Sequence, residues 1–419
     1  MLQKSYLIIL LFVFVSFKGN ALQADTVALT IKQADSIFLH QNLQLLAGLY
    51  EINARDAYVI QAKAYPNPVF TATLNAIDPQ NDKIFHIGPT GQKEFEIEQL
   101  LILGGKRKSG IAIARQQQEI AKAELADVLR NLKLQLHASL YLLNKHRIIL
   151  SSYDNQLAVL EVLIHSYQEQ ADKGNLPIKD VIRLKSVHLR IANNRMQVIA
   201  DYLGEVKRIQ TLLQITSIPI PVIEDQTFRV FEEIPVFDSL LDSAMTNRPD
   251  YKMANLQQDV AAKYLRLQKQ LAIPDMVLYS GYDQQGGAFR NQIQVGVAIP
   301  LPLWNRNKGN IRAAQFEQLK SELIVDEKQH AVHAEVLHAW AEMRGAIREY
   351  TKASGMYSRD FSDVFNGVNE NFRRRNISIL EFVDFFEAYN ESLADFQRIR
   401  TQLALSAEQV NHVTASSIY

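Results

Sequence analysis

Three histidines lie close together in the stretch HAVHAEVLHAW, which spans residues 330–340. Two histidines three residues apart on one helix, here His330 and His333, can bind zinc or copper, and Glu335 and Glu342 are near them. The spacing is not that of the HExxH motif, and His338, five residues beyond His333, is turned away from the face that the other two share. We therefore expect no metal site and interpret these residues as polar positions on a coiled-coil helix.

A second stretch that could do chemistry is LGGKRKSG, residues 103–110, which has the composition of a phosphate-binding loop. It does not match the pattern GxxxxGK followed by Ser or Thr, and the strand expected before it is amphipathic rather than buried. The sequence also has no GxSxG or comparable nucleophile motif, and no paired carboxylates in a pocket-forming fold. These observations predict that the protein is not an enzyme and has no cofactor.

The composition excludes several other classes of function. The 45 basic and 45 acidic residues give a formal net charge of zero, whereas a nucleic-acid-binding surface needs a basic excess. The chain has no cysteine, which excludes disulfide scaffolds, thiolate zinc sites and cysteine nucleophiles.

The first residues of the chain have the pattern of a secretory signal. Lys4 provides a positive charge, an apolar run of about 12 residues follows from Tyr6 to Phe17, and small residues then lead to Ala21. This run is shorter than the roughly 20 residues that a membrane-spanning helix needs, although an uncleaved anchor is the alternative. We predict cleavage after Ala21 or Ala24. No later segment is apolar enough to cross a bilayer as a helix, so any membrane-spanning part must consist of strands.

Long helices dominate the rest of the sequence. A helical pattern without proline extends from about residue 105 to 173, and such a helix would be roughly 100 Å long, which requires a coiled coil or an extended bundle. The sequence GNLP, residues 174–177, breaks this helix, and a second one is expected over residues 178–213. The apolar stripe of the first helix is formed by Leu125, Leu129, Leu132, Leu136, Leu140 and Leu143.

The second half of the sequence repeats the first. Ile311 and Ala314 lie 200 residues after Ile111 and Ala114, and each pair opens a long helical pattern. The break NLPIKD recurs as NISILE, so each half is expected to carry a helix, two strands and a long helical hairpin. We divide the chain into a signal peptide (1–21), a first repeat (22–217), a linker (218–240), a second repeat (241–410) and a C-terminal tail (411–419).

The predicted strands alternate strictly between apolar and polar residues. In QIQVGVAIPL the apolar side chains run from Ile293 to Leu301 at every second position, and in EFEIEQLLIL Phe95 and Ile97 oppose a row of glutamates. This pattern is typical of a membrane barrel with a water-filled lumen, and a sheet packed on a soluble core is the alternative. Four strands are too few to close a barrel, so two copies would give eight strands and three would give twelve.

The joint between strand and helix has the sequence PLPLWNRNKGNIRAA, residues 300–314. Pro300 and Pro302 cannot donate to a strand ladder and so mark where pairing ends, while Trp304 suits the membrane interface. Its counterpart in the first half is LLILGGKRKSG, where Gly104 and Gly105 provide the bend.

At these joints the sequence resembles the TolC family of outer membrane efflux proteins, in its CzcC/CusC-like branch. The resemblance extends over about residues 28–405, and its most specific parts are the two-half repeat and the joints. It implies a homotrimer in which a twelve-stranded barrel in outer membrane lipid continues as an α-helical tube across the periplasm. It also implies two partners, a periplasmic adaptor (membrane fusion) protein and an inner-membrane RND-type pump.

The resemblance also implies a pore constriction. Family members narrow the periplasmic end with carboxylates just after the second helical turn, and these positions match Glu381 and Asp384, with Asp180 equivalent to Glu381 in the first half. Ordinary solvated helix residues are the alternative reading. Possible partners of this ring are Arg373, Arg374 and Arg375. Many proteins of this branch carry an acylated N-terminal cysteine, and its absence here excludes that anchor.

The function expected from the sequence is that of a passive outer membrane efflux duct. The carboxylate ring and the resemblance favour heavy-metal cations as the exported substrate, with a multidrug duct of the same architecture as the alternative. A secreted periplasmic coiled-coil scaffold is a further alternative, but it leaves the alternating strands unexplained.

Overall fold

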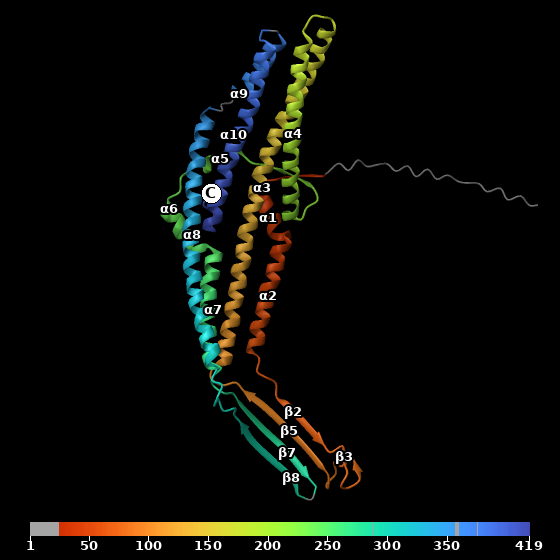
Figure 1. The fold of residues 1–419 in the computed structure, drawn as a ribbon, viewed down its shortest axis with the longest axis vertical. Helices are drawn as coiled ribbons and strands as arrows, with labels where there is room; N and C mark the ends of the chain where they lie inside the picture. Colours follow the sequence, from red (N-terminus) through yellow and green to blue (C-terminus); the bar gives the residue numbers. More distant parts are fainter. Residues whose placement is uncertain (1–24, 287, 357–359, 375) are drawn as a thin grey trace, which may run out of the picture.

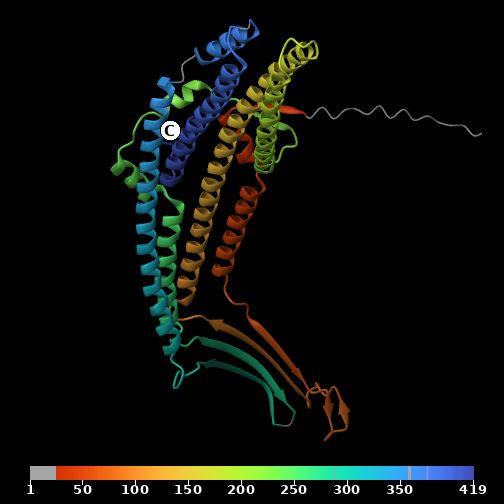
Figure 2. The ribbon, with the colours of Figure 1, turned by 45° about the horizontal axis from the view of Figure 1, so that its top comes forward.

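The computed structural model describes residues 25–286, 288–356, 360–374 and 376–419 of the chain. The expected signal peptide and Arg375 lie outside the described residues. The molecule is a long column of helices above a sheet, and the C-terminus lies at about mid-height of the column (Figure 1). The sheet bends away from the axis of the column (Figure 2).

The first half contains the two helices that the sequence predicts. Helix α3 has 67 residues and ends before Gly174, which has a φ of +75°, and helix α4 has 36 residues. The prediction of one long helix followed by a second one is confirmed. The elements are β1 (Thr26–Leu29), α1 (Ile31–Gln41), α2 (Leu43–Lys63), β2 (Val69–Leu74), β3 (Ile77–Asp78), β4 (Lys83–Ile84), β5 (Gln92–Leu101), α3 (Lys106–Asp172) and α4 (Ile178–Leu213).

The second half has the same order of main elements. Residues 218–240, expected as a linker, contain strand β6, which pairs in parallel with β1, and helix α5. The last helix continues to Thr414, so part of the expected tail is helical. The elements are β6 (Ile218–Pro221), α5 (Asp225–Val230), α6 (Phe237–Asn247), α7 (Pro249–Gln270), β7 (Met276–Gln285), β8 (Phe289–Ala298), α8 (Lys308–Met356), α9 (Asp360–Arg373) and α10 (Ile379–Thr414).

Both halves interrupt their first helix at the same place. Asn42, between α1 and α2, caps the second helix through its side chain and donates to the backbone oxygen of Leu212 at 2.9 Å. Arg248, between α6 and α7, donates to the oxygen of Val413 at 3.4 Å. Each break therefore joins the start of α2 or α7 to the end of α4 or α10.

The burial pattern repeats along the long helices. Positions 200 residues apart in α3 and α8 are equivalent, and so are positions 201 residues apart in α4 and α10, whose first residues are Ile178 and Ile379. The caps Gln214 and Ala415 both have a left-handed φ, 55° and 50°. Equivalent buried pairs are Leu132 and Val332, Leu136 and Val336, Leu143 and Met343, Val206 and Ala407, Ile209 and Val410, and Leu212 and Val413.

The four-stranded antiparallel sheet has the order β2-β5-β7-β8. Its register places Phe70, Ile97 and Val295 on one largely apolar face, where Val295 is 80% exposed. The opposite face, which we call the polar face, carries Glu96, with Thr71 on one neighbouring strand and Gly281 on the other. The predicted alternation is confirmed, although the strands end at Leu101 and Ala298, earlier than the pattern suggests.

The bend between sheet and helices depends on two successive glycines. Gly104 and Gly105 have φ values of +68° and +77°, in the left-handed region that side chains disfavour. Asp275, just before β7, accepts from the backbone N–H of Leu103 and from Lys106 Nζ, each at 2.8 Å. The first joint is therefore fixed by backbone conformation and by a carboxylate from the second half.

The helices pack around three hydrophobic clusters, one of which lies at the end of the column away from the sheet. Within the described chain, no helix combines the length and the apolar character needed to cross a bilayer.

Replacing Gly105 with alanine tests the bend. We expect Gly105→Ala to destabilise the protein by about 1–2 kcal/mol, because alanine is strained in the left-handed region. The measurement is the thermal midpoint of the protein in detergent. The control is Gly110→Ala, a helical position with open space around it, which should be neutral or stabilising. Equal midpoints for the two variants would contradict this account of the joint.

Candidate functional site

The far end of the column is held together by stacked aromatic rings. Phe372 of α9 and Phe382 of α10 stack at 4.1 Å between ring centroids, and Tyr167 of α3 stacks on Phe372 at 5.6 Å. An ion pair between Arg190 and Glu387 joins α4 to α10. The two helical hairpins are therefore fixed to each other at the end where the constriction carboxylates are expected.

Glu381 caps the helix on which it lies. Its carboxylate accepts from the backbone N–H of Ser378 at 2.7 Å, and the Ser378 hydroxyl accepts from the Glu381 N–H at 3.2 Å, which completes a capping box. The hydrogen bond from the Ser378 backbone lowers the pKa of Glu381. This residue stays ionised, but its carboxylate is tied to the helix start, a role that the spacing SILE could have indicated.

Asp180 lies where the repeat predicts, and Asp384 follows Glu381 on α10. Asp384 is exposed one turn after Glu381 on α10. Asp180 is the third residue of α4, as Glu381 is of α10, but Pro177 takes the cap position there and provides no capping side chain. Because the Ser378 N–H holds the Glu381 carboxylate, Asp384 is the α10 carboxylate that is more available to a ring around the opening.

Two of the three arginines expected near this ring are described: Arg373 ends α9, and Arg374 follows it. Arg374, the residue after α9, pairs with Glu370 of that helix at 2.9 Å. Among the described residues, no ion pair joins Arg373 or Arg374 to Glu381 or Asp384.

The polar face of the sheet gathers a second group of carboxylates. Glu94, Glu96 and Glu98 follow one another along it on β5, and Asp283 of β7 lies opposite Glu94. Among the paired positions that the structure describes on this face, there is no lysine or arginine. The charged residues at these paired positions are therefore all acidic, and the face would present negative charge to water.

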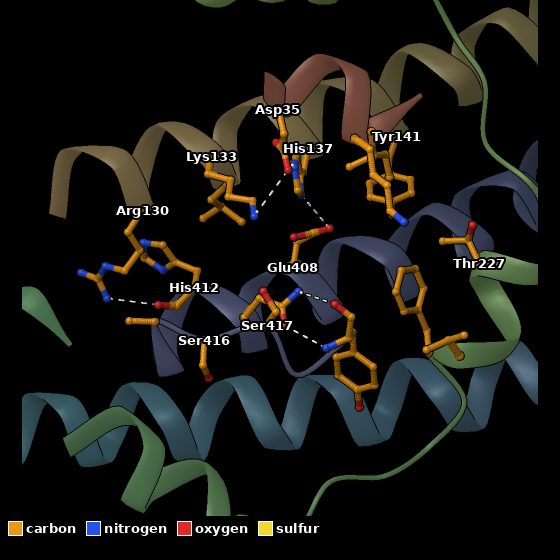
Figure 3. A pocket seen from close by; sticks show the side chains of 18 of the residues that line it. Asp35, Arg130, Lys133, His137, Tyr141, Thr227, Glu408, His412, Ser416 and Ser417 are labelled. Atoms are coloured by element: carbon orange, nitrogen blue, oxygen red, sulfur yellow. Dashed lines mark hydrogen bonds and ion pairs between the residues drawn. The ribbon is translucent and has the colours of Figure 1, made fainter. Parts of the chain in front are cut away.

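A pocket of about 1060 Å³ lies at mid-height, between α1, α3, α5 and the end of α10 (Figure 3). At its wall His137 Nε2 lies 2.7 Å from Asp35 Oδ1, and His137 Nδ1 lies 3.0 Å from Glu408 Oε1. Burial alone would lower the pKa of His137, but the two carboxylates outweigh it and raise the pKa to about 9. The protonated histidine joins α1, α3 and α10, and the sequence did not single it out.

A second charged group adjoins this pocket. Arg248 is 2% exposed and pairs with Asp250 at 2.7 Å and with Glu335 at 2.6 Å, while Lys328 reaches Asp250 at 2.8 Å. Burial would raise the pKa of Asp250, but its cationic neighbours hold it well below the usual range. Arg130 of α3 lies 3.6 Å from the same carboxylate, so the group connects both halves of the chain.

The histidines of α8 do not form a metal centre. His333 lies edge-on against Phe237, with ring centroids 5.7 Å apart, and His338 lies 3.5 Å from Glu342. No group of histidine, cysteine or acidic residues in the described part of the chain has the arrangement of a metal site.

The joint residues of the second half connect the end of β8 to the start of α8. Pro300 and Pro302 follow the end of β8, and Trp304 is 93% exposed. Asn307, at φ +57°, precedes α8 and donates to the backbone oxygen of Gln268 at 2.7 Å, which holds the start of α8 against the end of α7.

The charged contacts of His137 give a stability prediction. Because the folded-state pKa is raised, the stabilisation is complete below pH 6.5 and is lost as the pH rises through about 9. We expect His137→Gln to destabilise the protein by roughly 3 kcal/mol at pH 6, because it leaves two carboxylates without their cation. Thermal midpoints at pH 6 and pH 9.5 test this. The control is His165→Gln, whose side chain is 81% exposed, and an equal effect of both substitutions would refute the role of His137.

Comparison with known proteins finds related sequences and similar folds. The outer membrane efflux protein family matches residues 240–354. The cobalt-zinc-cadmium resistance protein CzcC of Cupriavidus metallidurans is 25% identical over 302 residues, which cover 71% of this chain and 69% of that protein.

Two solved structures share the fold. CusC superposes with a TM-score of 0.74 at 15% identity, covering 92% of both chains. The CmeC outer membrane channel of Campylobacter jejuni superposes with a TM-score of 0.75 at 11% identity, covering 92% of this chain and 86% of the other. At these identities the likeness concerns the fold.

The resemblance that the sequence suggests is confirmed: residues 240–354 match the outer membrane efflux protein family, and the chain shares its fold with CusC and CmeC.

Proposed function

We propose that three copies of this chain form a passive duct in the outer membrane, through which an efflux system exports its substrate. The sheets of the three copies form one barrel in the lipid, and the helices form a tube in the periplasm. A periplasmic adaptor protein and an inner-membrane RND-type pump meet the tube at its far end and supply the substrate and the energy.

The observation that carries this proposal is the difference between the two faces of the sheet. Its apolar face exposes large side chains, with Ile293 at 76% and Phe70 at 67%, while its other face carries carboxylates. Among the described strands, β2 and β8 each have a neighbour on one side only. Open edges in a bilayer leave backbone groups unsatisfied at several kcal/mol each, so β2 of one copy would pair with β8 of the next.

We propose metal cations as the substrate. The polar face brings Glu94, Glu96, Glu98 and Asp283 of each copy to the water-filled interior, and a lining of one charge sign concentrates cations. The name of the relative CzcC, a cobalt-zinc-cadmium resistance protein, points in the same direction. A multidrug duct is the alternative, because a passive duct does not need to recognise what passes.

The polar face can be tested by ion selectivity. We expect the triple variant Glu94→Gln/Glu96→Gln/Glu98→Gln to lower the ratio of cation to anion permeability, because it removes three carboxylates per copy from the water path. The measurement is the reversal potential of single channels under a salt gradient in a planar bilayer. The control is Lys93→Gln, on the opposite face of the same strand, which should leave the ratio unchanged. An unchanged ratio in the triple variant would exclude this face from the lumen.

The constriction can be tested without breaking the helix cap. Glutamine at residue 381 can still complete the capping box, so Glu381→Gln removes charge while the helix start is kept. We expect Glu381→Gln/Asp384→Asn to raise single-channel conductance, because three copies would lose six mutually repelling carboxylates that narrow and charge the opening. Asp395→Asn, an exposed carboxylate farther along α10, is the control. A double variant that conducts like its parent would show that these residues do not form a constriction.

The substrate class has a separate test. Cells that depend on this protein as their outer membrane duct should tolerate cobalt, zinc and cadmium, and loss of tolerance to hydrophobic drugs alone on its deletion would favour the alternative.

A further inference from the structure

The loop between β2 and β5, residues 75–91, lies beside the end of the sheet that is farthest from the helices (Figure 1). It contains the short hairpin of β3 and β4, in which Ile77 pairs with Ile84 and Asp78 pairs with Lys83. Successive side chains of a strand point to opposite faces, so the two isoleucines share one face of the hairpin and the charged pair shares the other.

The apolar face of this hairpin is exposed in the single chain. Ile77 and Ile84 are 71% and 78% exposed, and Phe85, the next residue along the chain, is 63% exposed. None of the three hydrophobic clusters in the described part of the chain includes these residues. The loop therefore offers three large apolar side chains to a partner that lies outside the chain.

The polar side chains of the loop find their partners within it. His86 Nδ1 lies 2.6 Å from Asp78 Oδ2, and His86 Nε2 lies 3.0 Å from Thr90 Oγ1. The side chains of His86 and Asp78 are only 6% and 12% exposed. Asp78 Oδ1 also accepts from the backbone N–H groups of Gln80 and Asn81, at 3.1 and 3.2 Å. Donors of the loop itself thus surround the negative charge of Asp78.

The loop is fixed to the sheet as well. Gln284 of β7, which is 5% exposed, donates to the backbone oxygen of Gly88 at 2.7 Å. The backbone N–H of Gly286 donates to the oxygen of Gly91 at 3.0 Å. Gly91 leaves no room for a side chain, because a Cβ atom there would lie 1.8 Å from the backbone oxygen of His86. The exposed isoleucines are therefore held at a defined place beside the sheet.

This distribution of side chains is the reverse of the one that water favours. Proteins in water usually bury large apolar side chains and expose charged ones. The loop instead encloses Asp78, His86 and Gln284 and exposes Ile77 and Ile84. Against hydrocarbon the same arrangement is favourable, because polar groups there must find their partners inside the protein. The loop therefore has the pattern of a segment that faces lipid.

The position of the loop agrees with this pattern. Strand β5 has ten residues, and a strand of that length rises about 34 Å, or roughly 25 Å when it is tilted as in a membrane barrel. The apolar band of such barrels is also about 25 Å tall. Trp304, which is 93% exposed, lies beyond one end of the strands, and the loop lies beyond the other. The loop would thus lie at the outer surface of the bilayer.

We propose that the hairpin of β3 and β4 inserts its apolar face into the outer leaflet of the outer membrane. The partner of this surface is membrane lipid, whose acyl chains contact Ile77, Ile84 and Phe85. Asp78 stays enclosed on the protein side, and Lys83 has the length to reach the headgroups. The inference rests on the proposed barrel, because the hairpin extends the lipid-facing surface of the sheet.

Site-directed fluorescence tests the insertion, because the chain has no cysteine of its own. Single thiols are labelled with the environment-sensitive fluorophore NBD, and the protein is reconstituted in vesicles of phosphatidylethanolamine and phosphatidylglycerol. We expect the probe at Ile84→Cys to emit at short wavelength and to be quenched by lipids that carry a nitroxide on the acyl chain. The control probe at Gln80→Cys, in the turn of the same hairpin, should emit at longer wavelength and be quenched by iodide from the water.

A reference probe at Ile293→Cys, on the apolar face of β8, separates the possible failures. Iodide quenching at residue 84 with lipid quenching at residue 293 would place the hairpin in water and leave the proposed barrel intact. Short-wavelength emission at residue 84 without quenching by either agent would show that protein, such as a second copy, covers the hairpin. If neither probe reports lipid, the proposed barrel fails together with the insertion.

A charge on the apolar face gives an independent readout. In protein labelled at Ile77→Cys, the further substitution Ile84→Asp should shift the emission to longer wavelength and replace lipid quenching by iodide quenching, because a carboxylate is costly among acyl chains. The matched substitution Lys83→Gln, on the opposite face of the hairpin, should leave the emission unchanged. Equal spectra for the two variants would refute the insertion.

Discussion

Backbone hydrogen bonding at the two open edges of the four-stranded sheet is the constraint on which the rest of the structure depends. A bilayer offers no water to satisfy the edges of β2 and β8, so the sheet requires a neighbour on both sides. Helices α4 and α8 also leave large apolar side chains exposed, among them Leu203 at 56% and Leu323 at 69%. The proposed assembly of identical copies would give both sheet edges a neighbour.

The duplication explains where charge lies in this molecule. Contacts between the two halves of one chain contain protonated His137, which meets Glu408, and Arg130, which lies 3.6 Å from Asp250. Such groups are costly to bury without their partners, and within one chain the partners are always present. At the equivalent positions of α8 the residues are His330 and Leu337, and both are exposed in the single chain.

At the far end of the helical column, a helix cap coincides with the position expected for the constriction. Glu381 completes a capping box and also lies on the helix turn expected at the constriction. Asp180 holds the equivalent position in α4 without such a cap, because Pro177 starts that helix. The two halves thus share a helix start of the same geometry, made by hydrogen bonds in one half and by the fixed φ of proline in the other.

Local patterns of the sequence predict much of this architecture. The spacing of leucines predicts α3, the alternation around Phe95 and Ile293 predicts the two faces of the sheet, and Gly104 with Gly105 predicts a bend. These features depend on the chemistry of neighbouring residues, which a single sequence displays. The predictions of the strand ends and of residues 218–240 as a linker were less accurate. Strand β6 lies in that segment, and it forms only when β1, far away in the sequence, lies beside it.

Tertiary structure alone decided which distant side chains meet. In the sequence, His137 is one polar residue in a helical pattern. The fold places two carboxylates against its ring: Asp35, 102 residues earlier in the sequence, and Glu408, far later in the sequence. The same holds for Asp275 at the joint, which meets Leu103 and Lys106 from the first half. Periodicity specifies which face of a helix is apolar, but only the packing of the two halves shows which face is covered within the chain and which still needs a partner.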